Sequence, residues 1–500
     1  MSVKFIDISL LVKLQNLNLL SMKKFFFISF LLIICSSCIT NSEEIEVVYP
    51  IPTERQISWQ KLDYYAFIHF NMNTFTNKEW GFGDEHPDQF NPTQLDTDQW
   101  AKIISEVGMK GIIITAKHHD GFCLWPSAYT DHSVKNSKWR NGKADIIKDL
   151  AESCKKYNLK FGVYLSPWDR NHMDYGTTKY INYFRNQLKE LLTNYGDIFE
   201  VWFDGANGGD GYYGGANEVR KVDKKNYYDW ENTVKIVREL QPDAVVFSDA
   251  GPDIRWVGNE KGYANQTTWS PILKDSLYPG MLNFNKFSAG QENGTHWIPT
   301  ETDVSIRPGW YYHPEQDNQV KTVEKLIDIY FNSVGLNSAL LLNIPVDTRG
   351  LIHENDEASL RGLNNYIQTT FDKNLAKESK IDVKSSRKKY KPELMIDDDL
   401  ESFWASPKFS NINTIDLKFD KKIQFDILEI SEPIKYGQRI KSFEISIETK
   451  SGWKKIFEGS TIGNRRLVRF NTQKTSKVRI KIKGSKAEPL ISNIGLFYSN

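Results

Sequence analysis

The residues best able to do chemistry lie in a short stretch, TAKHHDGFCLW, in which His118, His119 and Asp120 follow a run of apolar residues. Because the chain has only nine histidines, two adjacent ones need an explanation. Three interpretations are open: a metal site, a histidine pair in a core, and the polar wall of a substrate pocket. Adjacent residues on a strand point to opposite sides, so both rings reach one metal only where the strand is distorted. The zinc-binding pattern HExxH is absent from the sequence.

A second candidate is Asp204, which stands in EVWFDGA at the end of an apolar run and directly before a glycine. A buried carboxylate without partners is costly, so Asp204 either caps the following loop or is functional. Glycoside hydrolysis fits, because one carboxylate attacks the anomeric carbon while a second carboxyl group protonates the leaving oxygen. The second group would come from a neighbouring loop, where Asp249, Asp253 and Glu260 are the candidates.

Apolar runs recur along the chain at a spacing that suits alternating strands and helices. They are YYAFIHF from Tyr64, GIIITAKH from Gly111, KFGVYLSP from Lys160, IFEVWFDG from Ile198, AVVFSDAG from Ala244 and ALLLNIP from Ala339. Continuous apolar runs are typical of parallel strands that are buried on both faces. With the helical patterns between them, they predict an α/β fold, a (β/α)8 barrel whose sixth and seventh strands are not assigned. A doubly wound sheet is the alternative, although no Gly-rich phosphate turn follows the first run.

Polar residues follow five of these runs. In a barrel the carboxyl ends of all strands meet on one face, where active sites lie. The sequence therefore predicts one pocket, which favours the substrate-wall interpretation of the two histidines. Its lining would come from His69, Asn71, Asn73, Lys117, His118, His119, Asp120, Tyr164, Trp168, Asp169, His172, Asp204, Asp249, Asp253, Arg255, Trp256 and Glu260.

The pattern of apolar and charged residues divides the chain into regions. Residues 50–371 are predicted to form the barrel and the charged stretch 372–388 a linker. Residues 389–500 contain short alternating segments such as FDILEIS, which predict a β-sandwich. At the other end, MKKFFFISFLLIICSSC (residues 22–38) has a basic start and an apolar core too short to span a membrane.

The N-terminal segment resembles a bacterial lipoprotein signal, with a simple secretory signal as the alternative. In the first interpretation residues 1–38 are an extension and the signal, Cys38 is lipidated, and residues 39–49 are a tether. The protein would then be exported and anchored in a bacterial envelope, touching the membrane only through its lipid. A formal net charge of +1 gives no electrostatic reason to expect nucleic acid as a partner.

Five ordered motifs carry a resemblance to a known family. The motifs FIHFNMNTFTNKEWGFG, TAKHHDGFCLWPS, VWFDGA, FSDAGPDIRWVGNEKG and ETDVSIRPGWYYH resemble glycoside hydrolase family 29, the exo-acting α-L-fucosidases, over residues 50–370. The resemblance implies a retaining (β/α)8 hydrolase without metal or other cofactor, acting on fucosylated oligosaccharides or glycoproteins. GPDIRWVGNE and SIRPGW resemble the subfamily that prefers α-1,3 and α-1,4 fucose on branched, Lewis-type glycans.

The resemblance also implies roles for individual residues. Asp204 matches the nucleophile and Glu260 the general acid/base, with residues 207–225 as an insertion between them. Positions that hold the fucose are matched by His69, Glu79, Trp80, His118, His119, Tyr164 and Trp310, the last as a ring against the C5 methyl group. Asn71 stands where glycine is expected, and its side chain would narrow the pocket floor.

The acidic turn of the C-terminal region and the function of the chain each allow more than one interpretation. DDDLESFWASP (residues 397–407) resembles the start of a galactose-binding-like module whose acidic turn holds a structural Ca²⁺; an ordinary hairpin turn beside Trp404 is the alternative. The rival functions are another barrel glycosidase, such as a galactosidase, and a non-catalytic surface lectin. A lectin would need neither Asp204 nor Glu260.

Overall fold

The computed structural model describes residues 44–281 and 284–499. The chain divides into two units, residues 1–46 and 47–500, and the second contains both the barrel and the C-terminal domain. Cys38 and the signal predicted before it lie outside the described residues. Within the described ranges, no helix is both long enough and apolar enough to cross a membrane.

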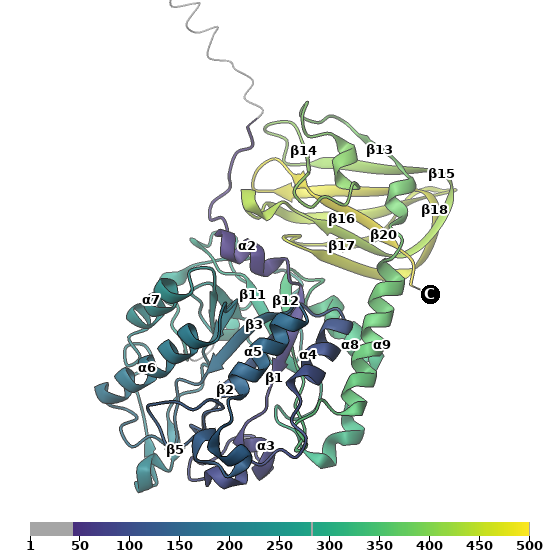
Figure 1. Ribbon diagram of the computed structural model, residues 1–500. Coiled ribbons are helices and arrows are strands. Elements are labelled where there is room, and N and C mark those ends of the chain that lie inside the picture. The colour runs from purple at the N-terminus through teal and green to yellow at the C-terminus, as the bar shows by residue number, and fades with distance from the viewer. Residues whose placement is uncertain (1–43, 282–283, 500) are drawn as a thin grey trace, which may run out of the picture. The chain divides into compact units, whose positions relative to one another are not determined.

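Eight parallel strands close into a barrel (Figure 1). Their order around it is β1, β12, β11, β8, β7, β4, β3, β2. Nearly every residue of these strands is buried, because helices cover the barrel and side chains fill its interior. This confirms the predicted (β/α)8 class. The strands are β1 (Tyr64–Ile68), β2 (Gly111–Lys117), β3 (Lys160–Leu165), β4 (Glu200–Trp202), β7 (Val245–Ser248), β8 (Ile254–Trp256), β11 (Thr300–Ser305) and β12 (Ser338–Asn343).

The helices around the barrel bury one apolar face each, and several begin at a side-chain cap. Asp96, Asp145 and Thr322 accept hydrogen bonds from backbone N–H groups in the first turns of α4, α5 and α8. The α-helices are α2 (Glu54–Gln60), α3 (Met72–Thr76), α4 (Thr97–Glu106), α5 (Ile146–Lys156), α6 (Thr178–Asn194), α7 (Trp230–Leu240), α8 (Val323–Asn332) and α9 (Glu354–Phe371). Short 3-10 helices are η1 (Pro87–Gln89), η2 (Val134–Asn136), η3 (Trp139–Gly142), η4 (Tyr213–Gly215), η5 (Lys274–Ser276), η6 (Phe284–Phe287) and η7 (Pro314–Gln319).

The two strands that the sequence left unassigned are β8 and β11. Parallel strands normally need a crossover of a dozen or more residues. Here residues 249–253 alone join β7 to its parallel neighbour β8. The segment between β8 and β11 contains the strands β9 (Pro271–Ile272) and β10 (His296–Trp297) and no α-helix in its described part. The regular alternation of strand and helix is therefore lost in this part of the barrel.

The C-terminal domain is an antiparallel β-structure. Its main sheet has the order β13, β15, β18, β16, β17, and β20 also pairs with β15. The stretch predicted as a linker contributes β13, because Ile381 and Val383 alternate with charged residues and pair with β15. The elements are η8 (Leu375–Glu378), β13 (Lys380–Val383), η9 (Pro392–Met395), β14 (Trp404–Ala405), β15 (Asn413–Ser431), η10 (Ile434–Tyr436), β16 (Ile440–Thr449), β17 (Gly452–Gly459), β18 (Arg466–Ser485), β19 (Leu490–Ile491) and β20 (Asn493–Phe497).

Contacts join the C-terminal domain to the amino end of the barrel. Arg465 forms an ion pair with Asp63, the residue before β1, at 2.5 Å, and a second with Glu429 at 2.8 Å. The backbone N–H of Asn337, the residue before β12, donates to the carbonyl of Arg465. These contacts lie at the amino ends of the strands. The pocket was predicted at the opposite, carboxyl ends.

Candidate active site

Asp204 lies two residues beyond the end of β4. Its Oδ1 accepts a hydrogen bond from the Ala206 N–H at 2.6 Å, and its Oδ2 accepts one from the Tyr164 hydroxyl at 3.2 Å. The side chain keeps 24% of its surface exposed, so it is open to a ligand. Burial raises the pKa of this carboxyl to about 7; the Ala206 bond opposes the rise, and the charges of Asp249 and Glu260 add to it.

Three histidine rings gather beside this carboxylate. His69 follows β1, and His118 and His119 follow β2. The adjacent rings lie side by side, with centroids 4.1 Å apart, because β2 ends at Lys117 and the chain then turns. The Nε2 atom of His119 is 3.9 Å from Oδ2 of Asp204. Burial lowers the pKa of His69 and His119 to about 3 and that of His118 well below its ordinary value, so all three rings are neutral at pH 7.

The turn after β11 places the Trp310 ring beside His69, with ring centroids 5.2 Å apart, and holds two carboxylates. The Trp310 indole N–H donates to Glu260 at 3.2 Å. Glu79 accepts hydrogen bonds from the backbone N–H groups of Trp310, at 2.9 Å, and Tyr311, at 3.4 Å, and contacts His313 at 2.7 Å. Glu79 and Glu260, which come from different loops, are thus both attached to one turn.

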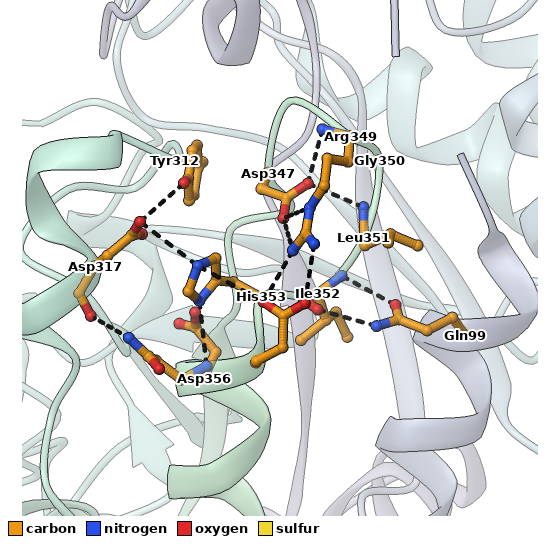
Figure 2. A network of polar contacts seen from close by, with 12 residues as sticks. Gln99, Tyr312, Asp317, Asp347, Arg349, Gly350, Leu351, Ile352, His353 and Asp356 are labelled. Carbon is orange, nitrogen blue, oxygen red and sulfur yellow. Dashed lines mark hydrogen bonds and ion pairs between the residues drawn. The ribbon is translucent and has the colours of Figure 1, made fainter. Parts of the chain in front are cut away.

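An ion-pair network behind this turn fixes its position. The Arg307 guanidinium and Asp356 carboxylate are both fully buried and form a bidentate pair, with the shortest contact at 2.6 Å. Arg307 also binds Asp317, 2.8 Å away. Figure 2 shows that Asp317 in turn contacts Tyr312 and His353, so the loops after β11 and β12 are joined. Losing one partner of such a buried pair lowers the free energy of unfolding by about 3–5 kcal/mol. The pair therefore holds the turn firmly in place.

The insertion predicted at residues 207–225 lies at the rim of the pocket. It contains a hairpin of β5 (Gly209–Gly211) and β6 (Glu218–Arg220). A side chain at Gly209 would collide with the Trp168 ring, 2.9 Å from the position of its Cβ, so glycine lets the hairpin approach closely. Trp80 lies edge-on to Trp168 and to His119 and is 52% exposed. Trp80 therefore presents an open aromatic face beside the histidines.

Four of the polar residues at the strand ends serve the scaffold. Lys117 is buried under α6 and pairs with Asp169 at 3.0 Å. Asp253 pairs with Arg238 and accepts from the backbone of β7, so it is not available as the second carboxyl group. Asn71 donates to two backbone carbonyls around β2, which explains this residue where glycine was expected.

Residues that the sequence analysis missed lie on β11. Asp303 accepts a hydrogen bond from the Trp256 indole at 2.7 Å, and burial, reinforced by the charge of Glu260, keeps its pKa well above the ordinary range. Glu301, two positions earlier, accepts from the Trp202 indole at 2.8 Å. The signal was present in the sequence as period-two alternation in TETDVS, where residues 301, 303 and 305 face one side.

The described part of the chain contains no group of three or more histidine, cysteine, aspartate or glutamate side chains that could hold a metal ion. In the acidic turn of the C-terminal domain, Asp397 accepts from the Ser402 hydroxyl at 2.7 Å and Asp398 pairs with Lys377. Both carboxylates thus contact side chains of the same domain. The Ca²⁺ expected there stays a prediction.

A closed parallel barrel that carries carboxylates, neutral histidines and aromatic rings at the carboxyl ends of its strands defines a barrel-type glycoside hydrolase. Comparison with known proteins gives the family. The family model "Alpha-L-fucosidase" matches residues 48–371, and the model "F5/8 type C domain" matches residues 380–494.

Similar proteins agree with both matches. Alpha-L-fucosidase 1 of Arabidopsis thaliana is 40% identical over 95% of this chain and 93% of its own length. A glycoside hydrolase 29 family member from an unknown rumen bacterium is 45% identical, with a TM-score of 0.83 over 91% of this chain and 78% of that chain. A Ruminococcus gnavus glycoside hydrolase 29 fucosidase in complex with fucose is 33% identical, with a TM-score of 0.83 over 92% and 97% of the two chains. The chain belongs to the α-L-fucosidase family, glycoside hydrolase family 29.

Proposed function

We propose that this α-L-fucosidase is a retaining, exo-acting enzyme in which Asp204 is the nucleophile and Glu260 the general acid/base. The observation that carries the proposal is the placement of Asp204, whose partly exposed carboxylate lies among neutral histidines and forms no ion pair with a lysine or arginine of the described residues. Glu260 is exposed and held by the Trp310 indole, as an acid that must reach a leaving group would be. The fucose complex of the Ruminococcus gnavus relative supports fucose as the sugar released.

The reaction would be a double displacement. The ionised Asp204 carboxylate attacks C1 of fucose, the bond from C1 to the glycosidic oxygen breaks, and that oxygen takes the proton of Glu260. In the second step Glu260 removes a proton from water, the water oxygen attacks C1, and the ester bond to Asp204 breaks. Retaining enzymes hold their two carboxyl groups about 5–5.5 Å apart, which is the separation expected for this pair.

The remaining pocket residues would bind the sugar. His69, His118, His119 and Glu79 offer polar atoms to the fucose hydroxyl groups, because neutral imidazoles and a carboxylate are good partners for hydroxyls. Trp310 would place its ring against the C5 methyl group. The exposed ring of Trp80 and the hydroxyl of Tyr164 complete the predicted contacts.

The proposed substrates are fucosylated oligosaccharides or glycoproteins, with α-1,3 or α-1,4 fucose on branched, Lewis-type glycans. The motifs GPDIRWVGNE and SIRPGW support this linkage, and they meet in space where the Trp310 indole of the second donates to Glu260 of the first. We also propose that the protein is exported and anchored in a bacterial envelope through a lipid on Cys38. A Cys38→Ala variant that still sediments with the membranes would contradict the anchor.

The test is fucose release from three substrates: a Lewis-type trisaccharide, an α-1,2-fucosylated lactose and an aryl α-L-fucoside. Each is incubated with the wild-type enzyme, Asp204→Ala and Glu260→Ala. Release from the branched trisaccharide, and its loss in both variants, is the expected result. Preference for the α-1,2 linkage would overturn the linkage, and glycan binding without cleavage would favour a lectin.

A further inference from the structure

Each of the three pocket histidines leaves one ring nitrogen, Nε2, without a hydrogen bond to any described residue, while its Nδ1 contacts one polar side chain. The contacts are His69 with Asn343 at 2.8 Å, His118 with Asn73 at 3.3 Å and His119 with Ser166 at 2.7 Å. A neutral imidazole has one N–H, so the role of Nδ1 decides whether Nε2 donates or accepts. We call Asn343, Asn73 and Ser166 the intermediary side chains. The other contacts of each one show whether it donates to Nδ1 or accepts from it.

The Asn343 amide is oriented by a backbone carbonyl. Its Nδ2 lies 2.8 Å from the carbonyl oxygen of Trp310, which can only accept, so this end of the amide is the NH₂ group. Oδ1 therefore faces Nδ1 of His69, and an oxygen with no hydrogen must accept there. The proton of His69 lies on Nδ1, and its Nε2 has a free lone pair.

Ser166 gives the same result for His119. The Ser166 hydroxyl donates its only hydrogen to the carbonyl of Trp168 at 2.6 Å. Its oxygen must then accept from Nδ1 of His119, so Nε2 of this ring also has a free lone pair. That nitrogen cannot donate to the nearby Asp204 carboxylate and is available to a hydroxyl group of a ligand.

Asn73 has the opposite effect on His118. Its Nδ2 donates one hydrogen to the carbonyl of Glu79 at 3.1 Å, which again fixes the amide. The second hydrogen of the same NH₂ group points to Nδ1 of His118, so this nitrogen accepts. The proton of His118 therefore lies on Nε2.

We propose that the pocket reads the hydroxyl groups of its sugar through an acceptor at His69, a donor at His118 and an acceptor at His119. The three intermediary side chains are positioning residues that set this pattern. The pattern gives the two adjacent histidines opposite roles, since His118 donates and His119 accepts. The assignment of protons stands on the hydrogen bonds alone, whereas its use in binding fucose rests on the proposed function.

The proton positions are measured by a two-bond ¹H–¹⁵N correlation spectrum of the full chain labelled with ¹⁵N-histidine at pH 7. His69→Gln, His118→Gln and His119→Gln variants assign the signals. His172, whose Nδ1 accepts from the Asp174 N–H at 3.1 Å, is an internal reference for a ring with the proton on Nε2. The expected spectrum shows His118 like this reference and His69 and His119 reversed. The opposite form at any of the three would overturn the pattern.

The functional arm uses Asn73→Leu, which removes the donor to His118, with Asn365→Leu on the exposed face of α9 as the matched control. On an aryl α-L-fucoside, kcat/KM of Asn73→Leu should fall about 10-fold, with His118 no longer held in one form, and the control should stay within two-fold. An unchanged spectrum and kcat/KM in Asn73→Leu would overturn the role of Asn73. An inactive wild-type enzyme would contradict the proposed function. The proton assignment would still be tested by the spectrum, which does not depend on activity.

Discussion

Replacing Asp204 by asparagine should abolish turnover and at the same time stabilise the fold. Burial raises the pKa of this carboxyl from 3.8 to about 7, so keeping it ionised at pH 8 costs folding free energy. Asparagine removes the charge and can keep both contacts, accepting from the Ala206 N–H and approaching the Tyr164 hydroxyl. The variant is therefore expected to be inactive and more stable than the wild-type protein.

The size of the gain follows from the shift in pKa. About three units at 1.36 kcal/mol each set a ceiling of about 4 kcal/mol, and the 24% exposure of the side chain reduces it to about 2 kcal/mol. An unfolding entropy of about 2.1 cal/mol/K per residue over roughly 450 residues gives about 1 kcal/mol/K, so Tm should rise by about 2 °C.

The gain must depend on pH and be larger at pH 8 than at pH 5. Because the folded pKa is raised, the wild-type protein loses stability as pH rises from about 4 through about 7. Differential scanning calorimetry should show the full gain for Asp204→Asn at pH 8 and about a third of it at pH 5. Asp243→Asn, at an exposed site, is the control. An equal gain at both pH values, or none at pH 8, would refute the reasoning.

Gly309→Ala would place a Cβ 2.3 Å from Oε1 of Glu79, so kcat/KM should fall about 10-fold or more while Tm changes little. Lys117→Met leaves Asp169 buried without its partner, so chemical denaturation should show a loss of about 3–5 kcal/mol in unfolding free energy. The pH profile of kcat/KM should fall as pH drops through about 7, because protonated Asp204 cannot attack; a flat profile from pH 5 to 8 would contradict this.

Much of the barrel could be predicted from the sequence because its first five strands are apolar runs that end in polar residues. The prediction failed to find β8 and β11 for physical reasons. β8 is three residues long and follows β7 without a crossover helix, so no spacing reveals it. β11 carries Glu301 and Asp303 inside the barrel, where their burial is offset by the indoles of Trp202 and Trp256.

The sequence predicted some residues of the candidate site and missed others. Asp204 and the paired histidines stood out because polar residues at strand ends converge in a barrel. The direction of each side chain did not follow from that argument, and Lys117 points into the helical layer instead. Asn343 and Ser166 were not identified, since an amide or hydroxyl that orients a histidine has no spacing of its own.

The most direct test of the central claim is to trap the covalent intermediate. With 2-deoxy-2-fluoro-α-L-fucosyl fluoride, the good leaving group permits attack on C1, and the fluorine at C2 slows hydrolysis of the ester. Mass spectrometry of the digested protein should find one 2-deoxy-2-fluorofucosyl group on the peptide that contains Asp204, and none in Asp204→Asn. A label on Asp249 or Asp303, or no label on an enzyme that releases fucose, would contradict the assignment of Asp204 as the nucleophile.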